Sequence, residues 1–336
     1  MTAPRSQHAP LSPFRIAPFF RTRIWGFHDL SPWFDYRATG EPIGEVWLTG
    51  DQCVAETGPL AGTRLDEIVN AHKFALLGEN YAGEAFPLLV KVLFPKEKLS
   101  VQVHPDDAMA KKYGDPRGKT ECWYALDAES GAQVALGIEP GIEPQAVRTA
   151  IEGSSLENLL TYVPVEKGDM IFVDAGTVHA IEPGVVILET QQNSDLTYRM
   201  YDYGRPRELH VDRSIEALNL HTRAGKVKPV VEKRHTKLID VPYFRLDRFT
   251  LSASGEGALP DSESDSGRFN DRVQILFIAD GEVTLFADSI IDGPIRLARC
   301  QTAIVPAHAG PWDLATSDRA EVIRILPQSG QAGTGS

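Results

Sequence analysis

LSVQVHPDD, residues 99–107, alternates apolar and polar side chains as far as His104. Such alternation predicts a β-strand with one buried face, because successive side chains in a strand point to opposite sides. Gln102 and His104 are therefore expected on one face, with Val101 and Val103 on the other. Two polar groups on the inner face of a sheet are costly to bury unless a partner satisfies them.

Two further stretches carry the same feature. GKTECWY, residues 118–124, places Lys119 and Glu121 on a shared face of a predicted strand, and GTVHAI, residues 176–181, places His179 just after a glycine turn. A divalent cation would satisfy these groups, because His nitrogen and Glu oxygen are ordinary zinc ligands. A single strand histidine is more often structural than metal-binding, so the prediction depends on the combination.

Short strands with Gly and Pro turns dominate the rest of the sequence, and helical periodicity is confined to a few segments. This pattern predicts a mainly β fold of sandwich or barrel type with a few short helices. The strands expected around the three motifs are residues 88–93, 99–104, 120–126, 132–137, 169–173, 185–190 and 197–201. The expected helices are residues 63–77 and 208–220, with shorter ones within residues 105–114 and 142–161.

The length of 336 residues suggests two domains of ordinary size. The spacing of Gly168, Asp174, Gly176 and His179 recurs at residues 300, 306, 308 and 311, where the glycines and the metal-type histidine are absent. This faint repeat suggests a duplicated barrel whose second copy lost its site. We expect a catalytic domain at residues 1–225 with helical insertions and a second, degenerate domain at residues 226–327. Residues 328–336 are expected to form a disordered tail.

Composition narrows the classes of function. A formal net charge of −12 argues against nucleic-acid binding, although a local cluster of Lys and Arg can still bind a small anion. Three widely spaced cysteines and the absence of a CxxC pair predict neither a disulfide framework nor a zinc ribbon, and favour a reducing, cytoplasmic compartment. We expect no membrane span and no signal peptide, because the apolar runs are short.

A polar and aromatic segment follows the apolar strand at residues 185–190. In the segment ETQQNSDLTYRMYDYGR, residues 189–205, Arg199 and Arg205 could bind phosphate through planar, charge-assisted hydrogen bonds. The alternative is a surface strand with solvated arginines, and composition does not decide between the two.

At these residues the sequence resembles the type I phosphomannose isomerases of the cupin superfamily, in their short bacterial form. The likeness covers most of the chain and is strongest at residues 99–107, 118–124, 176–181 and 187–205. It implies two cupin domains and a zinc-dependent interconversion of mannose 6-phosphate and fructose 6-phosphate through a cis-enediol. It also implies one zinc ion per chain, a small-molecule sugar phosphate as substrate, and a monomer or weak homodimer.

The resemblance assigns the zinc ion to His104, Glu121 and His179. Gln102 matches a fourth ligand of longer members of the family. Lys119 matches a lysine near the metal that is a candidate for proton transfer if burial and the nearby cation lower its pKa. A metal-bound water or a nearby histidine is the competing base, and the sequence does not choose among them.

The remaining expected site residues concern the substrate. The resemblance implies that Arg199 is an active-site arginine, which would stabilise negative charge on the substrate oxygens or the phosphate. Arg205, Lys98 and Ser100 are weaker candidates for binding the phosphate. The sequence departs from the family at Asp174, where cupins usually have proline.

Two other functions stay open at this point. The same ligand types could bind Fe(II) or Mn(II) in a metal-dependent cupin oxidoreductase, and a cupin could bind sugar without catalysis, because fold alone does not set function. Arg199 with Arg205 favours a phosphorylated substrate over the first alternative. A ligand set with Lys119 beside it exceeds what the second requires.

Overall fold

The computed structural model describes residues 10–36, 40–253 and 272–328, and these residues divide into two compact units. One unit consists of Phe20–Trp47 and Leu88–Val227. The other consists of the described residues up to Phe19, together with Leu48–Pro87 and the residues from Lys228 onward. We call them the first and the second unit and describe each by itself.

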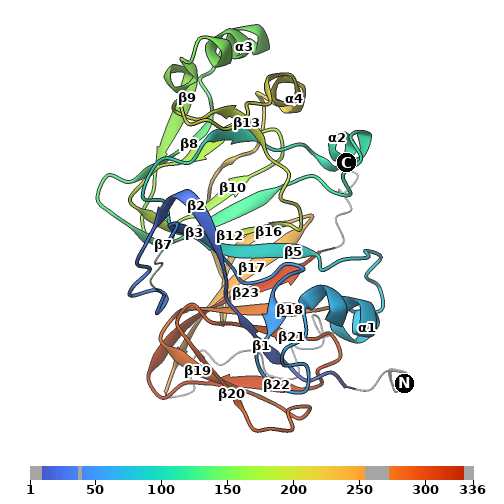
Figure 1. Ribbon diagram of the computed structural model, residues 1–336. Helices are drawn as coiled ribbons and strands as arrows, with labels where there is room; N and C mark the ends of the chain where they lie inside the picture. The colour runs from blue at the N-terminus through green and yellow to red at the C-terminus, as the bar shows by residue number, and fades with distance from the viewer. Residues whose placement is uncertain (1–9, 37–39, 254–271, 329–336) are drawn as a thin grey trace. The chain divides into compact units, whose positions relative to one another are not determined.

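The first unit is a pair of antiparallel sheets that share one apolar core (Figure 1). The larger sheet has the strand order β14 (Gly225–Val227), β10 (Met170–Val173), β7 (Glu121–Ala128), β12 (Val185–Gln192), β5 (Leu88–Leu93), β3 (Ile43–Trp47) and β2 (Phe19–Phe27). The smaller sheet has the order β13 (Tyr198–Tyr201), β6 (Val101–Val103), β11 (His179–Ile181), β8 (Gln133–Ile138) and β9 (Leu160–Pro164).

The core of the first unit lies between these sheets. Trp123 and Ile187 of the larger sheet pack in one buried cluster with Val134 and Ile181 of the smaller sheet. The short helices pack in a second apolar cluster. Val101 of β6 belongs to this second cluster and not to the cluster between the two sheets. They are α2 (Asp107–Lys112), α3 (Pro144–Glu152), the 3-10 helix η1 (Leu156–Leu159) and α4 (Val211–Ala217).

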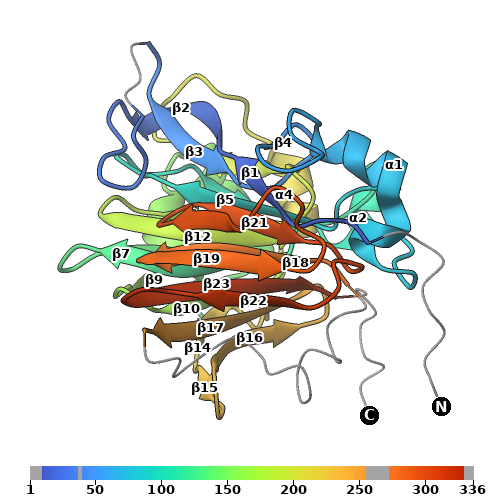
Figure 2. The same cartoon turned by 90° about the horizontal axis from the view of Figure 1, so that it is seen from below.

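The second unit also pairs two antiparallel sheets around an apolar core. The larger sheet, whose strands lie side by side in Figure 2, has the order β15 (Val230–Val231), β16 (Thr236–Val241), β17 (Phe244–Ser252), β23 (Arg319–Pro327), β18 (Gln274–Asp280), β21 (Thr302–Val305), β1 (Phe14–Ala17) and β4 (Val54–Ala55). The smaller sheet has the order β20 (Ile295–Ala298), β19 (Glu282–Ala287) and β22 (Trp312–Ala315).

Helix α1 (Leu65–Leu77) belongs to the second unit and matches the periodicity at residues 63–77. It buries Leu65, Ile68 and Leu76 on one side. It ends at Gly78, whose positive φ of 99° is a conformation that glycine adopts without the strain of a side chain.

The predicted mainly β fold with few helices is confirmed, and the strand at residues 88–93 has its predicted bounds. The two compact units do not contain the same segments as the two expected domains. The second unit begins again at Lys228, close to the predicted boundary, but Leu48–Pro87 and the described residues up to Phe19 cluster with it. The reason is pairing, because β1 pairs with β21 on one side and with β4 of the Leu48–Pro87 segment on the other. Residues 329–336 of the predicted tail lie outside the described residues.

The cysteines and the search for membrane-spanning helices bear on two further expectations. Cys53, Cys122 and Cys300 are buried free thiols. No helix among the described residues is long and apolar enough to cross a membrane.

Candidate active site

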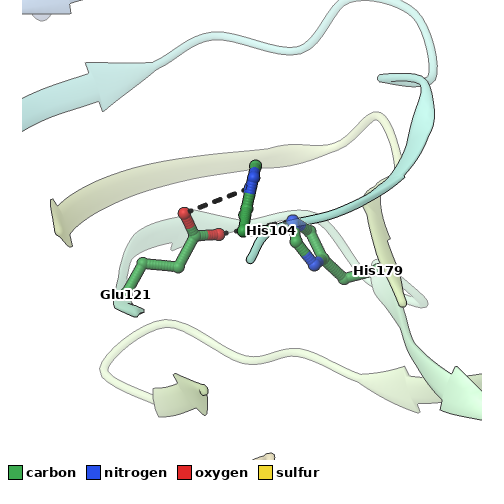
Figure 3. Close-up of side chains that lie close together, drawn as sticks. All are labelled: His104, Glu121 and His179. Carbon is green, nitrogen blue, oxygen red and sulfur yellow. Dashed lines mark ion pairs between the residues drawn. The ribbon is translucent and has the colours of Figure 1, made fainter. Parts of the chain in front are cut away.

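His104, Glu121 and His179 meet in the interior of the first unit. His179 opens β11, Glu121 opens β7, and His104 follows β6, which lies next to β11 in the smaller sheet. All three side chains are at most 1% exposed, and one ligand atom of each lies within 4.8 Å of the others. Figure 3 shows the Glu121 carboxylate turned toward the two imidazole rings. The three predicted ligands are therefore brought together from separate parts of the sequence.

The turn before His179 explains how its ring is aimed. Gly176 has a positive φ of 88°, and a Cβ there would lie 2.7 Å from the Cβ of Asn219, so the turn needs a glycine. Asp174 accepts a hydrogen bond from Thr177 Oγ1 at 3.1 Å and another from the Arg223 backbone N–H at 3.1 Å. Asp174, at the position where cupins usually have proline, thus holds this turn through side-chain hydrogen bonds.

Backbone carbonyls fix the orientation of both rings. His104 Nδ1 lies 2.8 Å from the Leu196 carbonyl, and His179 Nδ1 lies 2.9 Å from the Thr177 carbonyl. Each Nδ1 therefore carries the proton and donates it, which leaves the Nε2 lone pair available to a metal.

Burial also favours the ligating form of these rings. It lowers the pKa of His104 well below its usual range, with the positive charge of Lys119 as the next cause. Burial and then Lys119 lower the pKa of His179 to about 4. Neutral imidazole and ionised carboxylate are the forms that bind a cation, so the donor set fits a divalent metal.

Gln102 and Lys119 contact the cluster directly. Gln102 Nε2 lies 3.2 Å from His179 Nε2, while Lys119 Nζ lies 2.9 Å from His104 Nε2 and 2.7 Å from Glu121 Oε2. The ammonium group thus places positive charge against a buried carboxylate. A metal ion would compete with Lys119 for the same two ligand atoms.

A cavity of about 360 Å³ adjoins the cluster. Gln102 and Lys119 line it, and through them it reaches the three ligand residues, which do not line it themselves. Ser100, Arg199 and Trp123 also line the cavity. Its walls come from both sheets of the first unit, so the barrel interior that carries the cluster also has room for a small ligand.

Charges alternate along one wall of this cavity. From β2 to β12 the order is Arg23, Glu45, Lys91 and Glu189, and Glu189 is followed by Lys119. Arg23 binds Glu45 through two nitrogens at 2.9 and 3.1 Å, Lys91 Nζ lies 3.0 Å from Glu189, and Lys119 Nζ lies 3.7 Å from Glu189. Buried charges need such partners, since each would be costly alone. We call this set the charge ladder.

The ladder shifts the titration of its members in different directions. Burial opposes ionisation of Glu45, but Lys91 and Arg23 outweigh it and lower the pKa of Glu45 to about 2. Burial, reinforced by the charge of Glu121, raises the pKa of Glu189. Glu189 is therefore the carboxylate of the ladder that protonates more readily, a property of general bases.

The predicted substrate residues divide into two groups. Ser100 and Arg199 line the cavity, and Arg199 pairs with Gln102 across the strand register of β13 and β6. Lys98 and Arg205 are not among its lining residues. Lys98 lies 2.8 Å from Glu157 instead, and Arg205 binds the Lys98 carbonyl at 2.8 Å.

Sequence reasoning missed the charge ladder and one further arginine. Lys91 stands in the otherwise apolar run LLVKVL, which was a readable signal for a buried partner. Glu189 was only the first letter of a polar segment. Arg23, Glu45 and Arg207 gave no separate signal, because their significance depends on partners in other segments.

Comparison with known proteins places these features in a family. The sequence model described as "Phosphomannose isomerase type I, catalytic domain" matches residues 14–137. The chain is 38% identical to mannose-6-phosphate isomerase of Streptococcus mutans, over 69% of this chain and 77% of that protein. It is 37% identical to mannose-6-phosphate isomerase ManA of Bacillus subtilis, over 72% and 80% respectively.

Solved structures agree with these matches. The crystal structure of the mannose 6-phosphate isomerase from Bacillus subtilis is 28% identical, with a TM-score of 0.80 over 94% of this chain and 99% of that one. A phosphomannose isomerase mutant from Salmonella typhimurium is 17% identical, with a TM-score of 0.74, and this similarity concerns the fold alone. Likeness over nearly the whole length confirms the predicted cupin fold.

Proposed function

Because the chain belongs to the type I phosphomannose isomerases, we propose that it interconverts mannose 6-phosphate and fructose 6-phosphate. The observation that carries this proposal is the buried cluster of His104, Glu121 and His179 beside a cavity lined by Lys119 and Arg199. Such a site can hold a metal ion and a small anionic ligand together. Neither the oxidoreductase nor the non-catalytic alternative has an observation of its own in its favour.

We propose that the metal is zinc, one ion per chain, held by His104, Glu121 and His179. Two imidazole nitrogens and a carboxylate oxygen are a ligand set of catalytic zinc sites. A divalent ion held there would supply Lewis acidity toward the substrate oxygens. Gln102 is the fourth ligand in this proposal through its amide oxygen, because its amide group lies beside His179, with Nε2 3.2 Å from His179 Nε2.

Isomerisation of an aldose to a ketose moves one proton between C2 and C1 through a cis-enediol. Glu189 and Lys119 both line the cavity and lie 3.7 Å apart. We assign to Glu189 the removal of the proton from C2 of the aldose and its return to C1, because burial raises the pKa of this carboxyl. Lys119 then donates a hydrogen bond to a substrate oxygen, although the sequence makes it one of several candidate bases.

Arg199 is proposed to stabilise negative charge on the substrate. Its Nη1 donates to the Glu208 carbonyl at 3.0 Å, and no carboxylate pairs with it among the described contacts. A planar guanidinium with donors to spare suits an enediolate or phosphate oxygen.

The test is a coupled assay that follows fructose 6-phosphate formed from mannose 6-phosphate by the zinc-loaded protein. Turnover that disappears on chelation and returns with zinc is the expected result. A thermal shift with mannose 6-phosphate but no turnover would identify a binding protein instead. Oxygen consumption without isomerisation would point to the oxidoreductase.

A further inference from the structure

Two arginines of the cavity, Arg199 and Arg207, come from the edge strand β13 of the smaller sheet and from the segment that follows it. Arg199 leaves β13, and its backbone N–H and carbonyl bond to His210, three residues after Arg207. Arg199 Nη1 also donates to the Glu208 carbonyl at 3.0 Å, directly beyond Arg207 in the chain. Both arginines line the cavity, so two positive charges face the same space.

Asp202 holds Arg207 in a fixed orientation. Arg207 Nε and Nη2 donate to its two carboxylate oxygens, each at 2.6 Å, and Asp202 is 2% exposed. Those two bonds use one edge of the guanidinium, which has five N–H donors in all. The Nη1–Nη2 edge keeps its three remaining donors, the arrangement that binds phosphate in a bidentate manner.

A tight turn makes this arrangement possible. Tyr203 and Gly204 both have positive φ, 56° and 79°, and the Arg205 N–H bonds the Asp202 carbonyl at 3.0 Å. The chain therefore reverses immediately after Asp202 and returns Arg207 to the carboxylate. Arg205 contacts the same carboxylate at 2.9 Å, but it is not among the residues that line the cavity.

The charge balance selects this corner of the cavity for an anion. The charge ladder matches each of its cations with a buried carboxylate. In the corner, Asp202 pairs with two arginines, and Arg199 forms no ion pair among the described contacts, although the exposed Asp195 lines the same cavity. The positive charge of Arg207 also helps to lower the pKa of Arg199, after burial. An anion placed between them would relieve this repulsion.

We infer that Arg207, positioned by Asp202, binds the phosphate group of the substrate beside Arg199. The inference rests on the proposed isomerase function and deepens it, because it names the residue that selects a phosphorylated sugar. Ser100 lines the same cavity, but the proposal assigns it no contact with the phosphate. Arg205, the sequence-based candidate, also contacts Asp202 but does not line the cavity, so it is not placed to touch the phosphate.

The experiment compares Arg207→Ala, Arg207→Lys and Arg205→Ala in the zinc-loaded protein. Inorganic phosphate is titrated by calorimetry, and KM and kcat are measured with mannose 6-phosphate. Loss of a charge-assisted hydrogen-bond pair is expected to weaken phosphate binding by about 10- to 100-fold in Arg207→Ala, with kcat/KM falling by a similar factor. Arg207→Lys keeps the positive charge but loses the paired guanidinium donors. Its phosphate affinity and kcat/KM should lie between those of wild type and Arg207→Ala.

Arg205→Ala is the matched control, since it removes another arginine from Asp202. It should leave the phosphate affinity within a factor of about two of wild type, the scale of a negligible free-energy change. Phosphate affinity lost in Arg205→Ala but kept in Arg207→Ala would overturn the proposal in favour of the sequence-based candidate. Unchanged phosphate affinity in both Arg207 variants would also overturn it.

The titration separates this proposal from the isomerase function itself. If wild type binds phosphate through Arg207 but forms no fructose 6-phosphate, the subsite stands and the reaction does not. If wild type isomerises mannose 6-phosphate normally and Arg207→Ala does so with unchanged KM, the reaction stands and the subsite is refuted.

Discussion

At the scale of single residues, the cluster separates metal binding from catalysis. His104 is a proposed ligand whose Nδ1 is already bound to a carbonyl, whereas Arg199 lies across the strand register from Gln102 and contacts none of the three ligands in the described structure. Each residue can therefore be removed with a different consequence. A metal site loses its ion when His104 is removed but keeps it when Arg199 is removed. A purely structural charge cluster would show no such difference.

We expect His104→Ala to lose both zinc and turnover, because the proposed site loses one of its two imidazole ligands. Arg199→Ala should keep one zinc per chain while turnover falls by about 10²- to 10³-fold, the scale of a lost transition-state donor. Elemental analysis of the purified variants and the coupled assay measure both quantities. A His104→Ala protein that is metal-free and fully active would end the metal hypothesis.

Glu45 makes a prediction about acid stability. Its pKa of about 2 in the folded protein lies below the usual 4.5, so the folded state favours the ionised form. The corresponding stability is fully present above about pH 4.5 and is lost as the pH falls toward 2. The shift corresponds to about 3 kcal/mol, an order-of-magnitude figure.

Glu45→Gln should therefore be less stable than wild type at pH 7, and the difference in free energy of unfolding should shrink by pH 3. Denaturant unfolding at several pH values measures it. Glu41→Gln, at an exposed carboxylate nearby, is the control and should show little difference at any pH. An equal deficit for Glu45→Gln at pH 7 and pH 3 would mean that the charge of Glu45 does not stabilise the fold.

At the scale of elements, close backbone approaches bring the ligand strands together. A Cβ on Gly118 would lie 2.4 Å from the Asp106 carbonyl carbon, and the Lys119 N–H bonds the Pro105 carbonyl at 3.0 Å. The start of β7 is thereby packed against the residue that follows His104. Glu121 reaches the histidines from this position.

Gly118→Ala should accordingly disturb the metal site without touching a ligand. The added methyl group must displace backbone, at a cost of about 1–3 kcal/mol, and zinc affinity should fall with stability. Gly153→Ala is the matched control, because its nearest atom is 3.1 Å away and its φ of −85° suits alanine. Thermal unfolding and zinc titration of both variants would show whether this close approach matters.

Strand phase accounts for what the sequence could predict at this scale. Alternation in residues 99–104 correctly put Gln102 and His104 toward the site and Val101 into the other apolar cluster. Periodicity says nothing about which distant carboxylate a cation meets. Lys98 pairs with Glu157 and Arg207 with Asp202 through tertiary packing and a two-residue turn of positive φ, so neither pairing could be read from spacing.

At the scale of the whole molecule, the chain crosses between units more than once. The complete candidate site belongs to the first unit, whose residues are Phe20–Trp47 and Leu88–Val227. The second unit combines early segments with the C-terminal strands. The domain boundary expected near residue 225 stays a prediction. Leu48–Pro87 joins the second unit through contacts between distant segments, such as the pairing of β4 with β1, and these contacts leave no local signal in the sequence.

This organisation predicts that the chain cannot be shortened to its first two thirds. A chain ending at Val227 would keep β1 but lose β21, its partner in the sheet. It would also keep helix α1, whose buried side includes Leu65, Ile68 and Leu76, without the strands from β15 onward that complete the second unit. Apolar surface exposed in this way promotes aggregation.

We therefore expect the chain ending at Val227 to be largely insoluble and inactive, although every proposed metal and substrate residue is present. A chain ending at Gln328 retains all described strands and should match wild type in yield, zinc content and turnover. Soluble yield, dye binding to exposed apolar surface and the coupled assay compare the two. A soluble, zinc-binding and active chain ending at Val227 would mean that the first unit folds without the C-terminal strands, and that the early segments need no partner there.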